Sequence, residues 1–188
     1  MKKLLISIIF MVLMISLSMC INIKGINGGT GDHITNSDNT IYLNISGNIT
    51  ELPLRASVEE ALSTELINTS DSDILRHYLN TKIIYLEYNR SLSPKEGMVS
   101  IIDLSMKLGF LNPIYPHEIV DDSVFNNKSE IERVKNSNIT MVIKIIRSNS
   151  TAKISKINRT FIIEGNSLKE LDKAETRFIL AIYRGIAE

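Results

Sequence analysis

Residues 139–182 read ITMVIKIIRSNSTAKISKINRTFIIEGNSLKELDKAETRFILAI, and this stretch decides the fold of the chain. Three runs rich in branched apolar residues occupy 139–147, 152–157 and 160–164, and short polar turns separate them. Because branched and aromatic side chains suit a pleated sheet, these runs predict three strands in an antiparallel meander. Gly165 then interrupts the pattern and marks the turn into a helix.

The segment after this turn has the periodicity of an amphipathic helix over 168–184. Ser167 precedes Glu170 by three residues, which is a capping box: each side chain satisfies an otherwise free backbone donor of the first turn. Charged residues occupy one side, and the apolar positions recur at helical spacing: Leu168, Leu171, Ala174, Phe178 and Ile182. We expect this helix to pack on the sheet and to close the domain.

Two more helix starts upstream carry the same capping box, Ser57 with Glu60 and Ser93 with Glu96. In the second, Pro94 stands at the first helical position and Gly109 follows the apolar run, which confines the helix to 94–108. The other expected elements are a short helix at 74–79, a strand at 82–88 and a hairpin of 41–45 with 49–54.

Together these elements predict the α+β class, with helices packed on an antiparallel sheet in a single extracytoplasmic domain over 41–188. The apolar faces of the elements give the expected core. Its residues are Leu43, Ile84, Leu86, Ile102, Leu108, Val142, Ile145, Ile162, Leu171 and Phe178.

The N-terminal segment is typical of membrane targeting. Lys2 and Lys3 precede an uncharged run of twenty residues, Leu4 to Ile23. Twenty helical residues just cover a hydrocarbon core of about 30 Å. Small residues after the most apolar part favour cleavage as a signal peptide, and a signal anchor is the alternative. We therefore expect residues 1–20 to form a hydrophobic targeting helix that places the rest of the chain outside the cytoplasm.

Cys20 is the only cysteine, and it ends the apolar segment in a context that resembles a lipoprotein signal. The sequence departs from that signal at Met19, where the motif has Gly, Ala or Ser. Cys20 is therefore either a candidate lipidation site or an ordinary residue of a signal peptide. A body without cysteine excludes a disulfide framework, a thiolate zinc site and a cysteine nucleophile.

A flexible linker is expected over 21–40. Residues 25–40 hold four of the nine glycines and almost no apolar side chains. If the targeting segment is uncleaved, or if Cys20 is lipidated, this linker holds the domain off the membrane, which then becomes a partner of the protein.

One motif is enriched beyond chance, the N-glycosylation acceptor Asn-x-Ser/Thr with x not proline. The 17 Asn and 31 Ser and Thr residues of the chain would give about three such sequons by chance. The sequence has eight, most of them at predicted turns or element ends: Asn44, Asn48, Asn68, Asn89, Asn127, Asn138, Asn149 and Asn158. With an export signal, this excess predicts that several carry glycan, and the alternative is ordinary turn asparagines.

The sequence contains no nucleophile elbow, phosphate loop, dinucleotide fingerprint or His-Glu-x-x-His motif. The densest polar cluster follows a proline and contains His117, Glu118, Asp121 and Asp122. A cation or catalytic site there is weighed against a solvated connection, which we favour because nothing fixes the geometry. We therefore assign no catalytic, cofactor or metal residue, expect no cofactor and lean against an enzyme.

The charge balance bears on the class of partner. The 188 residues include 21 Lys and Arg and 21 Asp and Glu, which gives zero net charge and a pI near 6.8. Nucleic-acid binding needs a basic face that neutralises phosphates, so no nucleic-acid partner is expected.

The stretch 160–174 resembles strand-to-helix units in uncharacterised exported proteins of archaea with protein surface layers. The resemblance covers only the C-terminal part of the chain and rests on the strand, the Gly165 turn and the capping box. It implies an archaeal envelope setting, in which N-glycosylated surface proteins are common, and no functional residue is carried over from it.

These observations predict an exported, N-glycosylated cell-envelope protein with a structural or interaction role, in contact with other envelope proteins. The alternative is an extracytoplasmic module that binds a small ligand, which would need a pocket of about 300 Å³ or more with convergent polar groups. An unrecognised enzyme is the third class.

Overall fold

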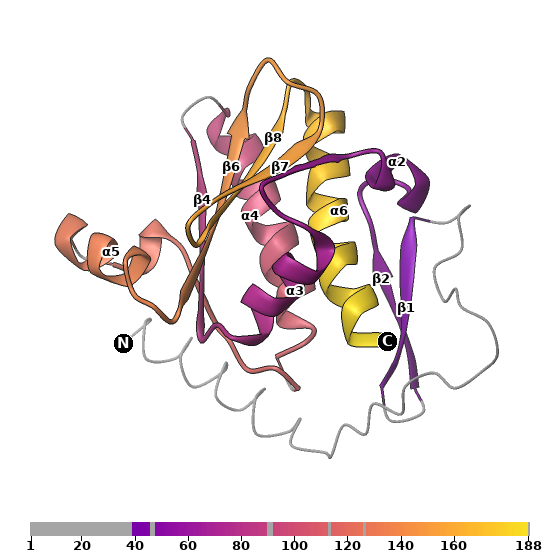
Figure 1. Ribbon diagram of the computed structural model, residues 1–188, viewed down its shortest axis with the longest axis horizontal. Coiled ribbons are helices and arrows are strands. Elements are labelled where there is room, and N and C mark those ends of the chain that lie inside the picture. Colours follow the sequence, from indigo (N-terminus) through magenta and orange to yellow (C-terminus); the bar gives the residue numbers. More distant parts are fainter. Residues whose placement is uncertain (1–38, 46–47, 90–91, 113, 126, 188) are drawn as a thin grey trace.

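The computed structural model describes residues 39–45, 48–89, 92–112, 114–125 and 127–187, and Figure 1 shows the course of the chain. Six strands form the main sheet: β3 (Glu65–Ile67), β4 (Ile83–Tyr88), β5 (Glu118–Val120), β6 (Thr140–Arg147), β7 (Lys153–Ile157) and β8 (Thr160–Gly165). A separate antiparallel hairpin consists of β1 (Thr40–Ile45) and β2 (Asn48–Pro53). The helices are α2 (Val58–Leu62), α3 (Asp71–Leu79), α4 (Pro94–Gly109), the 3-10 turn η1 (Asp122–Val124), α5 (Lys128–Lys135) and α6 (Leu168–Ala187).

The main sheet is mixed, with the strand order β3-β7-β8-β6-β4-β5. Among its described strands, only β7 and β8 pair antiparallel, through the turn at Asn158 and Arg159. The other four pairs are parallel. The α+β class with packed helices is confirmed, and the expected antiparallel sheet is corrected to a mixed one.

The meander expected over 139–164 is correct at its second turn and wrong at its first. β8 lies between β6 and β7, and it pairs with β6 in parallel, with Val142 opposite Thr160 and Arg147 opposite Gly165. The reason lies in β6, whose first four residues are all buried. A strand covered on both faces belongs in the interior of a sheet beside parallel neighbours, not in a half-exposed hairpin.

Both faces of the main sheet carry helices (Figure 1). α3, α4 and α6 cover one face, and the β1–β2 hairpin with α2 lies on the far side of α6. α5 lies on the other face, where Tyr85, Val120 and Val142 form a smaller cluster with Phe125. α6 is therefore a central helix, and its residues 178–183 are all buried.

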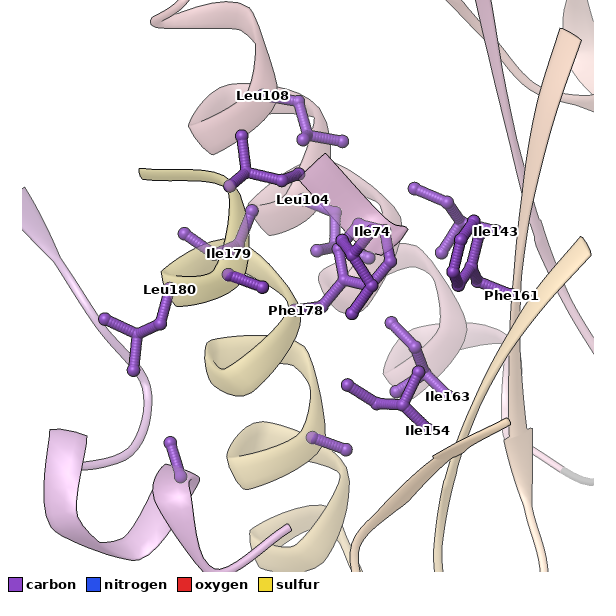
Figure 2. Close-up of a cluster of buried hydrophobic side chains, with 14 of the residues drawn as sticks. Ile74, Leu104, Leu108, Ile143, Ile154, Phe161, Ile163, Phe178, Ile179 and Leu180 are labelled. Atoms are coloured by element: carbon purple, nitrogen blue, oxygen red, sulfur yellow. The ribbon is translucent and has the colours of Figure 1, made fainter. Parts of the chain in front are cut away.

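Figure 2 shows how α6 fills the main core. Phe178 points from α6 toward the sheet, and its ring meets that of Phe161 edge-on, with the ring centroids 5.6 Å apart. Leu180 points away from the sheet on the other side of the helix. Seven of the ten expected core residues are buried: Ile84, Leu86, Leu108, Val142, Ile145, Leu171 and Phe178.

Two expected core residues lie elsewhere. Ile102 is 52% exposed. The buried side of α4 carries Leu104 and Leu108, and helical spacing places residue 102 on the opposite, solvent-facing side. Ile162 is half-buried, because strand alternation points its side chain to the face away from α6. Leu43 lies in the stretch 43–50, whose side chains are outside the description.

The helix ends follow the local sequence signals. The capping boxes at Ser57 and Ser93 are complete. At Ser167 the hydroxyl accepts from the backbone N–H of Glu170 (3.3 Å), while the Glu170 carboxylate accepts from the backbone N–H of Ala152 (2.8 Å). β3, β5 and α5 are absent from the expected elements, because the two strands have three residues each and α5 has no fully buried residue to mark its face.

Gly165, at the end of β8, is where the strand passes close to the start of α6. A Cβ atom added there would lie 2.6 Å from the backbone nitrogen of Leu171 and 2.8 Å from the carbonyl carbon of Glu170. We expect Gly165→Ala to lower the free energy of unfolding by about 1–3 kcal/mol, because backbone atoms must shift to admit the methyl group.

The matched control for this variant is Gly109→Ala, since nothing lies within 4 Å of a Cβ atom added at Gly109. Denaturant unfolding of both variants measures the difference. Equal losses of stability in the two variants would show that Gly165 has no special packing role.

Candidate functional site

A polar pocket of about 620 Å³ opens at the start of α3, next to the end of β7. Its lining comes from the turn after β3, the first two turns of α3 and one side chain of β7. The lining residues are Asn68, Thr69, Ser70, Ser72, Asp73, Arg76 and Lys156. This volume is above the lower bound of about 300 Å³ expected of a small-ligand site, and every residue of the lining is polar or charged.

The turn between β3 and α3 builds one wall of this pocket. Asn68 has a φ of 55°, a left-handed conformation that asparagine tolerates better than most residues. Ser70 then caps α3, and its hydroxyl accepts from the backbone N–H of Asp73 at 3.2 Å. The Thr69 hydroxyl donates to Asp73 Oδ2 at 3.3 Å, so one carboxylate ties the turn to the helix.

Asp73 is the electrostatic centre of the pocket. Lys156 Nζ donates to Asp73 Oδ2 at 2.6 Å, and the Arg76 guanidinium pairs with Oδ1 of the same carboxylate. Partial burial alone would raise the pKa of Asp73, but the hydrogen bonds from Lys156 and Arg76 outweigh it and hold this pKa below its usual range. The pocket therefore presents one carboxylate and two cations, a small excess of positive charge.

This arrangement suits the recognition of a polar molecule better than covalent chemistry on one. Hydroxyl, amide, carboxylate and cationic groups can donate and accept hydrogen bonds together. The Ser70 and Ser72 hydroxyls lie 3.0 Å apart, and within the described part of the chain no basic group accepts a proton from either. An unactivated serine hydroxyl is a weak nucleophile.

A second cluster of charged groups lies between α6, α4 and the loop after β2. Arg55 Nη2 lies 2.9 Å from Asp172 Oδ1, and Arg55 Nη1 lies 3.6 Å from Glu175 Oε2. Asp103 and Lys107 of α4 form an ion pair beside them. Glu175 is 1% exposed, so the cluster faces other protein groups and holds α6 to the loop that carries Arg55.

Burial changes the proton affinity of both carboxylates of α6. It raises the pKa of Asp172 to about 6, although the charge of Arg55 opposes the change. It raises the pKa of Glu175 to about 7, against the lowering effects of Ser100 and Arg55. These groups therefore exchange protons near neutral pH.

The polar side chains of the loop around His117 lie in different surroundings. The His117 ring is buried, with Nδ1 3.0 Å from the carbonyl oxygen of Thr81, and burial lowers its pKa. Glu118 is exposed on β5, and Asp122 accepts from the hydroxyl of Tyr85 on the other face of the sheet. Within the described residues, no group of three or more His, Cys, Asp or Glu side chains is arranged to hold a metal ion.

The sequon asparagines lie apart from one another on the molecule. Six have described side chains, and all six are exposed: Asn68, Asn89, Asn127, Asn138, Asn149 and Asn158. Asn127 caps α5 through Oδ1, which accepts from the backbone N–H of Glu130 at 2.9 Å. The Nδ2 atom, to which a glycan would be attached, takes no part in this cap. Asn44 and Asn48 lie in β1 and β2, and their side chains are outside the description.

The sequence of this chain places it in a family. No protein-family model and no solved structure matches it. An uncharacterised protein of Methanocaldococcus jannaschii is 42% identical to this chain over an alignment of 205 positions. The alignment covers 98% of this chain and 98% of that protein. This chain belongs to the family of that archaeal protein. The expected resemblance to uncharacterised archaeal proteins is confirmed in this coarser form, and the link to surface layers stays a prediction.

Other sequence predictions for this member of the archaeal family fall outside the described residues. They are the targeting segment 1–20, Cys20 and nearly all of the linker 21–40. Among the helices that the structure does describe, none is both long and apolar enough to span a membrane.

Neither the polar pocket nor the charged cluster around Glu175 was predicted from the sequence of this archaeal family member, although each left a signal there. Glu175 stands among the apolar positions Leu171, Ala174 and Phe178 of a helix, which places a charge on the buried face. The pocket left a weaker signal, a sequon at Asn68 whose third residue, Ser70, caps α3. Lys156 joins that pocket from 83 positions beyond Asp73, and no local pattern reveals such a contact.

Proposed function

We propose that this protein is an exported, N-glycosylated protein of the cell envelope with a structural or interaction role. The observation that carries the proposal is the exposure of all six sequon asparagines whose side chains are described. A glycan is bulky and strongly hydrated, so an occupied sequon must point to solvent. The N-terminal segment supplies the export signal, and it reaches the membrane if it is retained or if Cys20 is lipidated.

The backbone around the sequons supports the proposal. Asn158 lies in the turn between β7 and β8 with a φ of 57°, and Asn138 precedes β6. Asn149 lies in the loop between β6 and β7, and Asn89 directly follows β4. A sugar at these positions extends from a strand end into solvent and displaces no core residue.

An exposed apolar stripe on α4 supports the interaction role. Met98, Val99, Ile102 and Met106 recur along one side of the helix and are between 42% and 61% exposed. Apolar side chains that gather on the surface of a folded domain mark interaction sites. Methionine adapts its shape to different partners, which suits a contact with other envelope proteins.

The native protein is expected to carry glycan on at least half of its eight sequons and to begin between Met19 and Ile21. Intact mass of protein purified from its native host measures cleavage, lipid and glycan together. Glycopeptide mass spectrometry then assigns each sequon separately.

Two results would contradict this proposal independently. Unmodified peptides at most of the sequons would show that the excess of Asn-x-Ser/Thr is compositional. A native chain that still begins at Met1 would show that the segment is a signal anchor and not a cleaved signal peptide. The glycopeptides alone would then decide whether the protein is glycosylated.

The pocket favours a second candidate function, an extracytoplasmic module that binds a small polar ligand. A volume of about 620 Å³ lies within the range of small-molecule sites. All of its lining residues carry polar or charged groups, which suits a hydroxylated or charged molecule better than a wholly apolar one. The two candidates meet at Asn68, because a glycan on this residue and a free ligand would compete for the same space.

A further inference from the structure

We propose that the polar pocket at the start of α3 is the binding site of the glycan carried by Asn68 of the same chain. The inference rests on the proposed glycosylation, and it adds the ligand of the pocket. Asn68 is an exposed sequon asparagine and is itself one of the residues that line the pocket.

The pocket offers the groups that sugar hydroxyls bind. Lys156 and Arg76 are donors, Asp73 accepts, and the hydroxyls of Thr69 and Ser72 do both. A sugar hydroxyl accepts from a cation and donates to a carboxylate at once, and both bonds are strengthened by the charge on the protein group. The net charge of the lining is small, which fits a neutral, polyhydroxylated ligand.

Covalent attachment removes the need for high affinity. A sugar tethered at the edge of the pocket has an effective concentration of about millimolar or more, so contacts too weak to capture a free sugar hold an attached one. Asn68 also lies between the end of β3 and Ser70, the cap of α3, so regular structure flanks the attachment point on both sides.

Asn158 provides a matched comparison. Both asparagines are exposed sequon residues with left-handed backbone, φ 55° at Asn68 and 57° at Asn158. Asn158 lies in the turn after β7, two positions from Lys156, yet it is not among the residues that line the pocket. A glycan on Asn158 is therefore close to the pocket without being attached to its wall.

The test measures how accessible Arg76 is in the folded glycoprotein. Arg76 lines the pocket, and its side chain is 68% exposed in the chain without glycan, so an arginine-selective dicarbonyl reagent can reach it. Wild type, Asn68→Gly and Asn158→Gly are produced in the native host, and glycine keeps the left-handed backbone in both variants. Peptide mass spectrometry gives the labelling rate of each arginine, with the exposed Arg133 of α5 as internal reference.

We expect Arg76 to be labelled severalfold more slowly in the wild type than in Asn68→Gly, with Asn158→Gly matching the wild type and Arg133 unchanged in all three. Equal Arg76 rates in wild type and Asn68→Gly, with Asn68 fully glycosylated, would overturn the inference and leave the proposed function intact. An equal rise in Asn158→Gly would show general shielding by sugars and would also overturn it. An unmodified Asn68 in the native protein would remove the proposed glycosylation at this sequon, and the inference with it.

Discussion

Replacing Phe178 with alanine is expected to lower the free energy of unfolding by about 3–5 kcal/mol. The Phe178 side chain is fully buried, and it joins the central helix α6 to the ring of Phe161 on β8. Loss of the ring removes its transfer free energy and leaves a cavity between α6 and the sheet, which the rigid elements around it can fill only in part. Urea unfolding followed by circular dichroism gives the difference.

Ile102→Ala is the control for this variant. Ile102 lies on α4 with 52% of its surface exposed, so its truncation should change the stability by about 0.5 kcal/mol or less. A Phe178→Ala variant no less stable than Ile102→Ala would mean that α6 does not pack on the sheet through this face. If Phe178→Ala fails to fold, Phe178→Leu preserves part of the volume and still reports a graded loss.

Replacing Glu175 with glutamine is expected to stabilise the protein by up to about 3 kcal/mol near pH 8 and to have little effect near pH 4. Burial raises the pKa of this carboxyl from 4.5 to about 7. The difference corresponds to about 3 kcal/mol of cost for the ionised form in the folded state. Glutamine has nearly the same shape and carries no charge, and Arg55 keeps its contact with Asp172.

The direction in which stability changes with pH follows from proton binding. Between pH 4.5 and about 7, the folded protein keeps a proton on Glu175 that the unfolded chain releases. The stability of the wild type should therefore fall as the pH rises through this window. Asp172, with a pKa raised to about 6, acts in the same direction. The pKa values of Asp73 and Glu87 are lowered, so the stability they provide is lost only at more acidic pH.

Denaturant unfolding across this pH range measures the effect, with Glu59→Gln as the matched control. Glu59 is an exposed glutamate of α2, and its replacement removes the same charge from the surface. We expect Glu59→Gln to keep the pH dependence of the wild type and Glu175→Gln to reduce it. Parallel curves for all three proteins would show that Glu175 does not bind a proton in the folded state.

Most elements of the fold could be predicted because their signals are local. The expected helix at 94–108 corresponds to α4 (Pro94–Gly109), and Ser93 caps it as predicted. The turn at Asn158 and Arg159 joins two antiparallel strands as expected. Caps, turns and periodicity each depend on residues a few positions apart, so the sequence records them directly.

The order of the strands could not be predicted, because it depends on contacts between distant segments. β3 pairs with β7, which places Leu66 opposite Ile154, and β8 inserts between two strands that precede it in the chain. The polar pocket has the same origin, since Lys156 reaches Asp73 only after this pairing forms. The buried charge of Glu175 differs from these features, because it could have been predicted from neighbouring residues, as a charge on an apolar helix face.

The central position of α6 has a consequence for the order in which the chain is made and its core is completed. α6 follows every other described element along the chain, yet the sheet and the β1–β2 hairpin both depend on it for cover. The last sequon, Asn158, precedes α6 by ten positions, so all eight sequons leave the ribosome before the helix that completes the core. At about 5–20 residues per second, synthesis of the remaining chain takes a few seconds. During that interval the core still lacks α6, so the glycosylation that we propose would meet sequons in a chain that has not finished folding.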